Sequence, residues 1–373
     1  MKYKLKDILL VIIFFSILLI TFFVNIITED ELISVSERRK LASFPKIDTV
    51  FNGDYTQKFE SYATDQFIYR DEFRKIKENV EFNLFLKKDN NDLYIKNGKI
   101  YKNIGILNEN EVKKAASKFN KVYDKYLNKN ESKLNNVYYS IIPDKSYYLE
   151  NNALKLDVKR MEEILDESLY YNFRYIDIKD LLDKDSYYDT DIHWKQENLL
   201  GVVQKINSEM ERETIINNYQ MLSKGKFKGG YSGQLITSDE LFDYLKYIST
   251  DEIENAITYN YETQKESKVY DISKWEKSND KYDFYLSGPV NIMEIRNKTN
   301  DFTNYEKNKN LVIFRDSFAS SLVPLLIGNY EKITLVDLRY ISTDYVGNFV
   351  SFEDSDVLFL YSDLVINSST MLK

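Results

Sequence analysis

The chain contains no cysteine and only one histidine, and these two shortages exclude several kinds of chemistry. Without cysteine there are no disulfide bonds, no thiolate metal ligands and no thiol redox reactions. One histidine without a carboxylate cluster supplies too few ligands for a metal ion, so no metal site is expected. The protein must therefore fold on its hydrophobic core alone, and 373 residues with 43 % hydrophobic content suffice for that.

The chain also lacks an excess of positive charge. Its 51 Lys and Arg residues are outnumbered by 59 Asp and Glu residues, which gives a formal net charge of −8 at pH 7. Binding to nucleic acid needs a basic surface that neutralises phosphates, so no nucleic-acid partner is expected. The 31 tyrosines carry no functional weight here, because a general bias toward Tyr, Asn and Lys explains them equally well.

A long apolar segment stands near the N-terminus. Ile8–Ile27 is a run of 20 residues that only Ser16, Thr21 and Asn25 interrupt. As a helix it would be about 30 Å long, which matches the hydrocarbon core of a bilayer. The run predicts a transmembrane helix.

The residues that flank this run give its orientation. Lys2, Lys4 and Lys6 precede it, and the acidic residues Glu29–Glu31 follow it. Lysine and arginine stay on the cytoplasmic side, so we expect a single-pass membrane protein with a cytoplasmic N-terminus and an extracytoplasmic body. A cleaved signal peptide is the alternative, although Thr28 and the residues after it offer no small-x-small cleavage site. The body is exported in both cases.

The remaining chain divides into three parts. Residues 1–28 hold the expected anchor, residues 29–90 resemble a helical stalk or cap, and residues 91–373 form the main domain. Asn97-Gly98 predicts a hairpin between 93–96 and 99–101. In the main domain, amphipathic helices at 111–127, 158–171 and 196–210 alternate with apolar strands at 137–142, 175–178, 311–314, 333–336 and 357–360. This alternation predicts an α/β sandwich with a mostly parallel sheet, into which 222–310 is inserted as an irregular, polar segment.

The single histidine lies in the segment Asp189-Thr190-Asp191-Ile192-His193-Trp194. Alternate side chains of an extended segment share a face, so the Asp191 carboxylate can reach Nδ1 of His193. That contact would fix the tautomer and leave Nε2 free as a general base. A packed or surface histidine in a turn is the alternative, with Trp194 as a packing residue beside it.

A serine follows the first of the three late apolar strands. Residues 311–314 lead into a sharp turn at Arg315-Asp316-Ser317, and a helix is expected to start near Ser317. A serine at that junction projects from the carboxyl edge of the sheet, where α/β folds bind ligands. Backbone N–H groups at the helix start could hold an oxyanion. The alternative is that Asp316 or Ser317 only caps the helix.

Taken together, the two motifs make a set, because a nucleophilic serine needs a nearby base and the chain has one histidine. Thr190–Trp194 followed by Arg315–Phe318 resembles the AlgJ/AlgX-like, SGNH-hydrolase-like acetyltransferase family, and most closely its DHHW branch. The motif departs from the usual one at Arg315, where glycine is common. Further segments that resemble the family are Leu41–Pro45, Phe59-Glu60, Asp65–Asp71, Pro143–Lys145 and Asp337–Tyr340.

The resemblance implies an SGNH-hydrolase-like three-layer fold with Ser317 as nucleophile, His193 as base and Asp191 as the residue that orients it. The order Asp-His-Ser does not matter to the chemistry, because a triad is defined by its geometry. Arg339, just after a predicted strand, is expected either to bind substrate or to form a structural salt bridge. The glycine-rich segment 227–233 is either a substrate loop or a plain turn.

The same resemblance implies an O-acetyltransferase that modifies an exported exopolysaccharide or cell-wall glycan, without a cofactor. Because acetyl-CoA is cytoplasmic, a polytopic membrane O-acyltransferase is the expected acetyl donor. An acetylesterase with the same triad is an alternative, since only the acceptor differs. A non-catalytic, membrane-anchored scaffold or glycan-binding module of a polysaccharide export system is the other.

Overall fold

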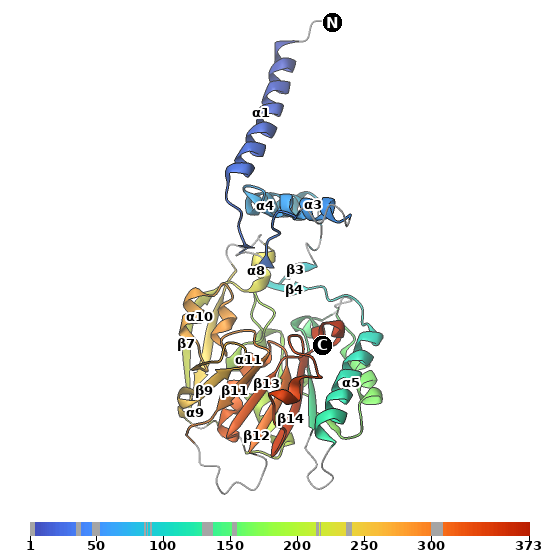
Figure 1. The fold of residues 1–373 in the computed structure, drawn as a ribbon, viewed down its shortest axis with the longest axis vertical. Coiled ribbons are helices and arrows are strands. Elements are labelled where there is room, and N and C mark those ends of the chain that lie inside the picture. The colour runs from blue at the N-terminus through green and yellow to red at the C-terminus, as the bar shows by residue number, and fades with distance from the viewer. Residues whose placement is uncertain are drawn as a thin grey trace. The chain divides into compact units, whose positions relative to one another are not determined.

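The computed structural model describes residues 4–34, 39–46, 53–85, 87, 89, 92–128, 137–150, 155–213, 216, 218–235, 241–299 and 309–373. The chain divides into two compact units (Figure 1). One comprises Met1–Asn91 with Ser232–Asp239, and the other Asp92–Tyr231 with Glu240–Lys373. Lys2 of the orientation argument and residues 300–308 of the expected insertion lie outside the described residues.

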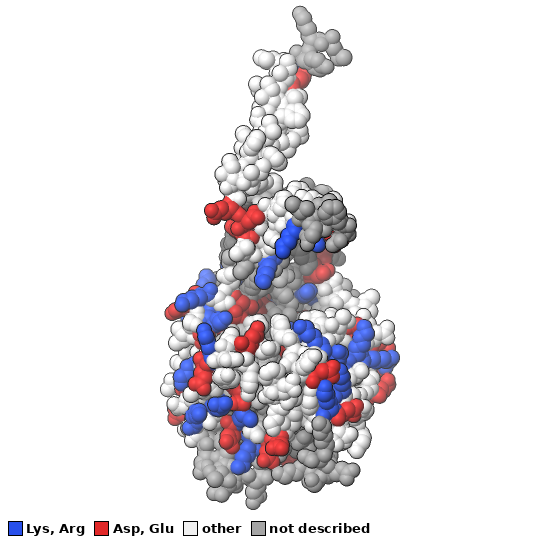
Figure 2. Space-filling model, in the orientation of Figure 1, with Lys and Arg blue, Asp and Glu red and all other residues white. Residues whose placement is uncertain are grey.

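The first unit contains the apolar helix and the expected stalk. Helix α1 (Leu5–Ile27) has 23 residues, is long and apolar enough to cross a membrane, and buries none of its side chains. In Figure 2 it is a nearly uncharged column with acidic residues at its foot. Such a helix near the N-terminus is a membrane anchor or a signal sequence.

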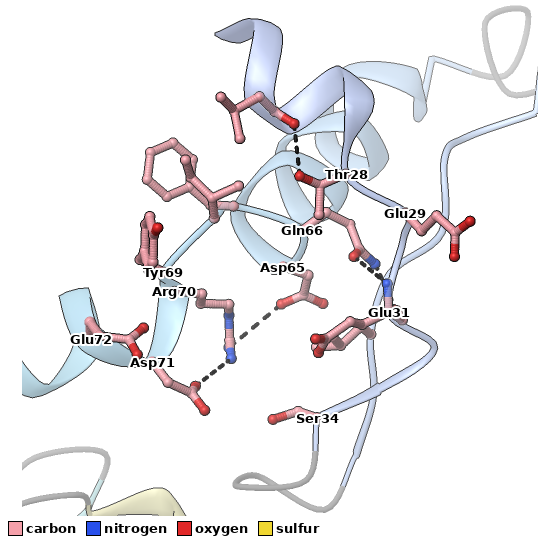
Figure 3. Close-up of a pocket in the computed structure, with 14 residues that line it drawn as sticks. Thr28, Glu29, Glu31, Ser34, Asp65, Gln66, Tyr69, Arg70, Asp71 and Glu72 are labelled. Carbon is pink, nitrogen blue, oxygen red and sulfur yellow. Dashed lines mark hydrogen bonds and ion pairs between the residues drawn. The ribbon is translucent and has the colours of Figure 1, made fainter. Parts of the chain in front are cut away.

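Two further helices lie at the foot of α1. They are α3 (Tyr55–Asp65) and α4 (Arg70–Asn79), and α4 continues as a π-helical turn, η1 (Val80–Leu84). The break between α3 and α4 centres on Tyr69, whose φ of 55° interrupts the right-handed helix. A short antiparallel pair, β1 (Ile33–Ser34) with β2 (Arg39–Lys40), and the described residues 232–235 also belong to this unit. Figure 3 shows how the α3–α4 turn and the end of α1 line a common pocket.

The second unit begins with the predicted hairpin, which is confirmed. Strand β3 (Leu93–Lys96) pairs with β4 (Lys99–Lys102). Asn97 and Gly98 both have positive φ angles, 52° and 77°. A two-residue hairpin turn of this hand requires such angles, and Asn-Gly tolerates them better than other pairs.

An eight-stranded sheet forms the centre of this unit, in the order β10-β9-β11-β13-β12-β14-β5-β6. The strands from β13 to β6 are parallel, and β11, β9 and β10 form an antiparallel edge. The sheet is therefore mixed. Its strands are β5 (Val137–Ile142), β6 (Phe173–Tyr175), β9 (Ile257–Asn260), β10 (Lys265–Lys268), β11 (Ile292–Arg296), β12 (Asn310–Arg315), β13 (Lys332–Val336) and β14 (Ser355–Ser362).

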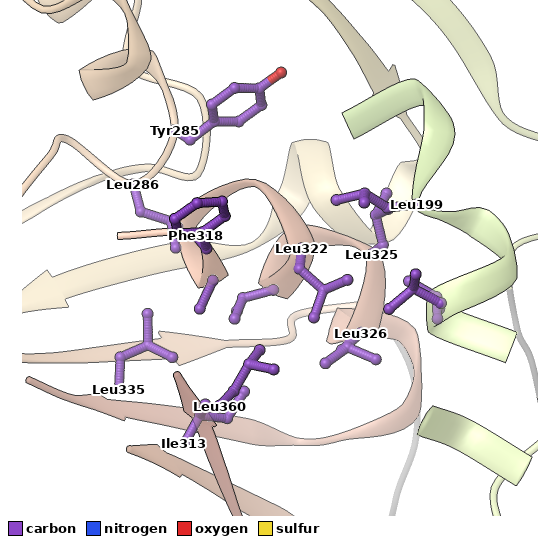
Figure 4. Close-up of a cluster of buried hydrophobic side chains, with 14 of the residues drawn as sticks. Leu199, Tyr285, Leu286, Ile313, Phe318, Leu322, Leu325, Leu326, Leu335 and Leu360 are labelled. Carbon is purple, nitrogen blue, oxygen red and sulfur yellow. The ribbon is translucent and has the colours of Figure 1, made fainter. Parts of the chain in front are cut away.

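Helices cover both faces of this sheet, so the fold is a three-layer α/β sandwich. Helices α5 (Glu109–Val122) and α6 (Val158–Ser168) pack on the face that carries Val312 and Phe314. Helix α7 (Leu200–Glu209) and the segment after Ser317 pack on the opposite face, with Ile313 and Leu360 (Figure 4). Strands buried on both faces have apolar residues at nearly every position, which is why the sequence predicted these strands.

Residues 222–310 are more regular than their polarity suggested. They contain most of a β-hairpin, β7 (Gln220–Phe227) with β8 (Asp243–Ser249), as well as the three antiparallel strands of the sheet. Edge strands and hairpins that face water on one side carry many polar residues, so the polar composition of this segment did not predict strands. The short helices here are α8 (Gly230–Gln234), α9 (Asp251–Asn255) and α10 (Ile272–Lys277).

Two other local predictions differ from the structure. Strand β6 is Phe173–Tyr175 rather than 175–178, because Ile176 and Ile178 enter the core after pairing has ended. Helix α11 starts at Ala319 and is short, and it continues as a 3₁₀ helix over Val323–Asn329, where proline occupies the first turn. A last short helix, α12 (Asp363–Ile366), follows β14.

Candidate active site

Ser317 stands in the turn that follows β12. Both oxygens of the Asp316 carboxylate hold this turn: Oδ1 accepts the Phe318 N–H at 3.0 Å and Oδ2 accepts the Ser362 N–H at 2.7 Å. Ser362 ends the neighbouring parallel strand β14, so the turn is fixed to the carboxyl edge of the sheet. Asp316 is buried, and Ser317 remains partly accessible to solvent.

The structure brings Ser317, His193 and Asp191 into one hydrogen-bonded chain. His193 Nε2 lies 2.8 Å from Ser317 Oγ, and Nδ1 lies 2.6 Å from Asp191 Oδ1. The serine and the histidine are 124 positions apart in the sequence. His193 and Asp191 are both buried. A carboxylate at Nδ1 keeps the proton on that nitrogen, which leaves Nε2 to accept the serine proton.

Two side chains next to the histidine fasten its segment to the serine segment. The indole Nε1 of Trp194 donates to the Phe318 carbonyl at 2.9 Å, and Nε2 of Gln196 donates to the Ser321 carbonyl at 2.6 Å. The Tyr282 ring stacks on the His193 ring with centroids 3.8 Å apart and planes 5° apart. Trp194 is a packing residue, as the sequence predicted, and its N–H also links the two motifs.

The Asp191 carboxylate is held from a second direction by the glycine-rich segment. Its Oδ2 accepts the Gly230 N–H at 2.7 Å, and Gly229 lies against the backbone of Thr190. A Cβ on Gly229 would stand 2.4 Å from the Asp191 Cβ, so only glycine allows this approach. The segment is therefore a close support of Asp191, for which the adjacent pair Gly229-Gly230 was the only sequence signal.

Asp243, on β8, organises the same stretch and had no role in the sequence analysis. Its Oδ1 accepts the Asp189 N–H, and its Oδ2 accepts both the N–H and the hydroxyl of Thr190, all within 2.8 Å. Asp189 itself pairs with Lys99 rather than with the histidine. The carboxylate of Asp191 is thus presented to His193 by a backbone that polar contacts fix on both sides.

Lys145 lies beneath this segment and is fully buried. Its Nζ donates to the carbonyl of Tyr188 at 2.9 Å and to that of Asp191 at 2.8 Å. The ammonium also lies over the rings of Tyr101 and Tyr231, at 5.5 and 5.1 Å from their centroids. Burial lowers the pKa of Lys145 to about 8, against the opposing effect of nearby carboxylates. The sequence placed Lys145 in a family segment but gave it no role.

A pair of buried carboxyl groups follows the neighbouring strands β5 and β14. Asp363 Oδ2 accepts the Asp144 N–H at 2.9 Å, and Asp144 Oδ1 accepts the Ser146 N–H at 2.8 Å. Burial, reinforced by the Asp144 carboxylate, raises the pKa of Asp363 well above its ordinary value. Burial also raises the pKa of Asp144. The pair lies in the same part of the fold as Asp316, which contributes to the field on Asp363.

Arg339 and Arg315 both form contacts within the protein. Arg339 makes a bidentate ion pair with Asp337, at 2.9 Å from Nε to Oδ1 and 2.7 Å from Nη2 to Oδ2. This is the salt bridge expected as one alternative, and a substrate-binding role stays a prediction. Arg315, which replaces the usual glycine, is fully buried and donates through Nη1 to the Asp316 carbonyl and to Ser320 Oγ. Burial lowers the pKa of Arg315.

The arrangement is suited to acyl transfer through the serine. A hydroxyl bonded to an imidazole whose other nitrogen meets a carboxylate is the geometry that activates serine as a nucleophile. Within the described parts of the chain, no three His, Asp or Glu side chains are grouped in a way that could hold a metal ion. The chemistry of the site therefore centres on Ser317, His193 and Asp191.

Comparison with known proteins gives similarity in structure but not in sequence. No protein-family model matches the chain, and no curated protein matches it. The fold is similar to that of a DHHW family protein from Eubacterium siraeum, with a TM-score of 0.55 and 18 % identity over 76 % of this chain and 98 % of that one.

It is also similar to PatB1 from Bacillus cereus in two structures, both with a TM-score of 0.55. The structure with a sulfonyl adduct is 17 % identical over 74 % of this chain and 97 % of that one. The other is 16 % identical over 74 % and 96 %. At such low identities these matches establish the fold alone. It is the fold of the DHHW branch that the sequence resemblance implied.

Proposed function

We propose that this protein is an O-acetyltransferase that acetylates an exported polysaccharide through an acetyl-serine intermediate on Ser317. The observation that carries the proposal is the hydrogen-bonded chain Ser317–His193–Asp191, with distances of 2.8 and 2.6 Å. The fold shared with the DHHW family protein and PatB1 supports it as an analogy. Ser317 itself remains partly accessible to solvent.

In the first half-reaction, His193 Nε2 takes the proton of Ser317 while Oγ attacks the carbonyl carbon of an acetyl donor. The resulting imidazolium protonates the leaving group, and the acetyl group stays on the serine as an ester. In the second half-reaction, His193 Nε2 takes the proton of a sugar hydroxyl, whose oxygen attacks that ester. The imidazolium then gives the proton to Ser317 Oγ as the acetyl group leaves the serine. Asp191 stabilises the imidazolium in both steps and is not itself protonated.

The location of the protein determines where its acetyl group comes from. In this proposal α1 is an uncleaved anchor, the N-terminus is cytoplasmic and the body is extracytoplasmic at the cell surface. Since acetyl-CoA remains in the cytoplasm, a polytopic membrane O-acyltransferase passes the acetyl group across the bilayer. The acceptor is an exopolysaccharide or a cell-wall glycan.

An acetylesterase is the second candidate, because the same triad would pass the acetyl group to water. The purified full-length chain in detergent, assayed with a chromogenic acetyl ester with and without a glycan acceptor, distinguishes the two. A transferase gains turnover and acetylates the glycan when acceptor is added. An esterase releases acetate at the same rate in buffer alone.

The same assay tests the catalytic assignment. Ser317→Ala and His193→Ala are each expected to reduce turnover by about 10⁴-fold or more, because the members of a triad act as a unit. Ser351→Ala, at an exposed serine outside the site, is the matched control and retains full turnover. A sulfonyl fluoride should label the wild-type protein at Ser317 and leave the Ser317→Ala variant unlabelled. Equal turnover in wild type and Ser317→Ala would refute the proposal and favour a non-catalytic scaffold.

A further inference from the structure

The helix after Tyr69 carries an apolar stripe that the first unit leaves uncovered. Phe73, Ile76 and Val80 recur at intervals of three and four residues, which places them on one side of α4 and its continuation, and Tyr69 and Leu84 flank them at the two ends. Each is between 36 % and 71 % exposed. The stripe, called the α4 stripe below, consists of Tyr69, Phe73, Ile76, Val80 and Leu84.

On the opposite side of α4 (Arg70–Asn79), polar side chains are turned inward. Glu78 is 1 % exposed. The half-buried Arg74 donates to Asp71 Oδ1 at 3.2 Å and approaches the Gly233 and Gln234 carbonyls, of the same unit, at 3.5 and 3.4 Å. An amphipathic helix of a water-soluble protein has the reverse arrangement, with its apolar side inward. The inversion indicates that the apolar side meets a non-aqueous medium.

Hydrogen bonds place the start of this helix at the level of the end of α1. Asn25, two residues before that end, accepts the Ile68 N–H on its Oδ1 at 2.9 Å. Gln66 exchanges two further hydrogen bonds of 2.9 Å with the backbone of Glu31. Figure 3 shows Gln66 and Glu31 joined beside the last turn of α1. The turn that precedes the α4 stripe is thus joined to the foot of the apolar helix.

The length of α1 indicates how deep in a membrane the contact between Asn25 and Ile68 would lie. A helix of 23 residues is about 35 Å long, slightly more than the roughly 30 Å of hydrocarbon that it has to cross. If α1 spans the membrane, Asn25 lies within a few ångström of the hydrocarbon boundary, and so does Ile68. Aromatic and aliphatic side chains at that depth are stabilised by the interface, whereas in water they would be exposed.

We propose that residues 69–84 are an interfacial membrane-binding helix, with the α4 stripe inserted in the outer leaflet about 5–10 Å below the headgroups. The proposal rests on the anchor function of α1 proposed above. In this proposal α1 stays uncleaved, and its last turn is a hydrogen-bonding part of this unit. Residues 69–84 contain four basic and four acidic side chains, so apolar insertion rather than charge drives binding.

Because the chain has no cysteine, a single introduced cysteine gives a unique labelling position. Phe73→Cys and Ile76→Cys, in the α4 stripe, are compared with Lys75→Cys, which is exposed on the same helix but off the stripe. Each full-length variant carries a nitroxide label in nanodiscs of zwitterionic phosphatidylcholine. Collisions with oxygen and with a water-soluble nickel complex are then measured.

Labels at positions 73 and 76 are expected to collide more with oxygen and less with nickel, and the label at 75 should show the opposite. Water-like collisions at all three positions overturn the proposal. Insertion that requires anionic lipid, or protection seen only in native membranes, also overturns it, because the first indicates charge-driven binding and the second a protein partner.

A second variant guards against local misfolding caused by the label. In Phe73→Glu with the label at Val80→Cys, position 80 is expected to lose its protection from nickel, while the circular dichroism spectrum stays unchanged. Protection that persists would argue against insertion. Acetyl-ester turnover is measured on the same samples, so failure of the membrane proposal and failure of the proposed acetyl transfer are seen separately.

Discussion

Asp191 and Asp363 are both buried carboxyl groups of the same unit, and the difference between them shows what burial does to a charge. Asp191 accepts hydrogen bonds from the His193 ring and N–H and from the Gly230 N–H. Asp363 accepts the Asp144 N–H on one oxygen, and its other oxygen, Oδ1, has no hydrogen-bond partner among the described residues. Asp144 Oδ2 likewise has no hydrogen-bond partner among the described residues.

The lesson is that a buried carboxylate is useful where donors converge on it and costly where they do not. Three hydrogen-bond donors converge on Asp191, whose carboxylate orients His193 and stabilises its imidazolium. The pair Asp144–Asp363 has a second carboxyl group where a donor would be needed, and burial raises the pKa of each.

Removing the charge of Asp191 should have the largest effect, and it should appear in turnover. Asp191→Asn is expected to reduce kcat for an acetyl ester by about 10³- to 10⁴-fold, because an amide leaves the imidazole in the wrong tautomer. Asp189→Asn is the control, since Asp189 pairs with Lys99 and not with His193. Comparable losses in the two variants would mean that the contact with the histidine carries no special role.

Neutralising a buried carboxylate that has a cationic partner should lower stability, whereas neutralising a member of the pair Asp144–Asp363 should raise it. Asp337 is fully buried and forms the bidentate ion pair with Arg339. Asp337→Asn is expected to destabilise the protein by about 3 kcal/mol, because it leaves the guanidinium without its charge partner. Urea unfolding at pH 7 measures this, and a variant as stable as wild type would contradict it.

Asp363→Asn should stabilise the protein, and the gain should depend on pH. The folded-state pKa of Asp363 is raised, so the folded protein takes up a proton as pH falls toward the ordinary value of 3.8. Wild type therefore becomes relatively more stable on acidification, and the carboxyl group costs most at high pH. We expect the variant to be more stable than wild type at pH 8, with a smaller advantage at pH 5.

Urea unfolding of both proteins at the two pH values checks this prediction. The asparagine retains an oxygen for the Asp144 N–H, so the comparison isolates the charge. An advantage of the variant that grows as the pH falls would have the wrong sign, and would show that the Asp363 carboxylate is stabilised in the fold.

Local sequence patterns were sufficient for the centre of the fold and insufficient for its supports. The runs 137–142 and 311–314 are apolar at nearly every position because both faces of those strands are buried, and such runs are legible. Ser317, His193 and Asp191 could be named because the chain has one histidine and because the segments around His193 and Ser317 resemble the motifs of a known family. The structure brings their side chains together, and their catalytic role stays a prediction.

The residues that support the site leave no local signal, since each acts on a distant segment. Asp243 caps the Asp189–Thr190 backbone from more than 50 positions away, and it lies in a polar stretch that reads as irregular. The antiparallel edge was missed for the same reason. Strands β9 and β10 carry many polar residues, and Glu294 interrupts the buried apolar residues of β11, which are Ile292, Met293 and Ile295.

Lys145 links the two carboxyl groups Asp144 and Asp191, because it follows Asp144 in the chain and its Nζ donates to the backbone carbonyl of Asp191. Lys145→Met keeps the length of the side chain and removes the donors, so the carbonyls of Tyr188 and Asp191 lose their partner. We expect kcat to fall about tenfold with KM nearly unchanged, because the buried lysine positions Asp191 and cannot touch substrate. Lys179→Met, which breaks the pair of Lys179 with Glu162, is the matched control and should keep its kcat.

The pH dependence of stability separates this positioning role from simple packing. Burial lowers the pKa of Lys145 from 10.5 to about 8, so between these values the unfolded chain binds more protons than the folded one. As the pH rises from 8 to 10, the free energy of unfolding of the wild type should therefore increase relative to that of Lys145→Met. If the difference between the two proteins did not change over that range, Lys145 would not be the buried, strained cation that holds the Asp191 segment, and a loss of kcat in Lys145→Met would have to come from packing alone.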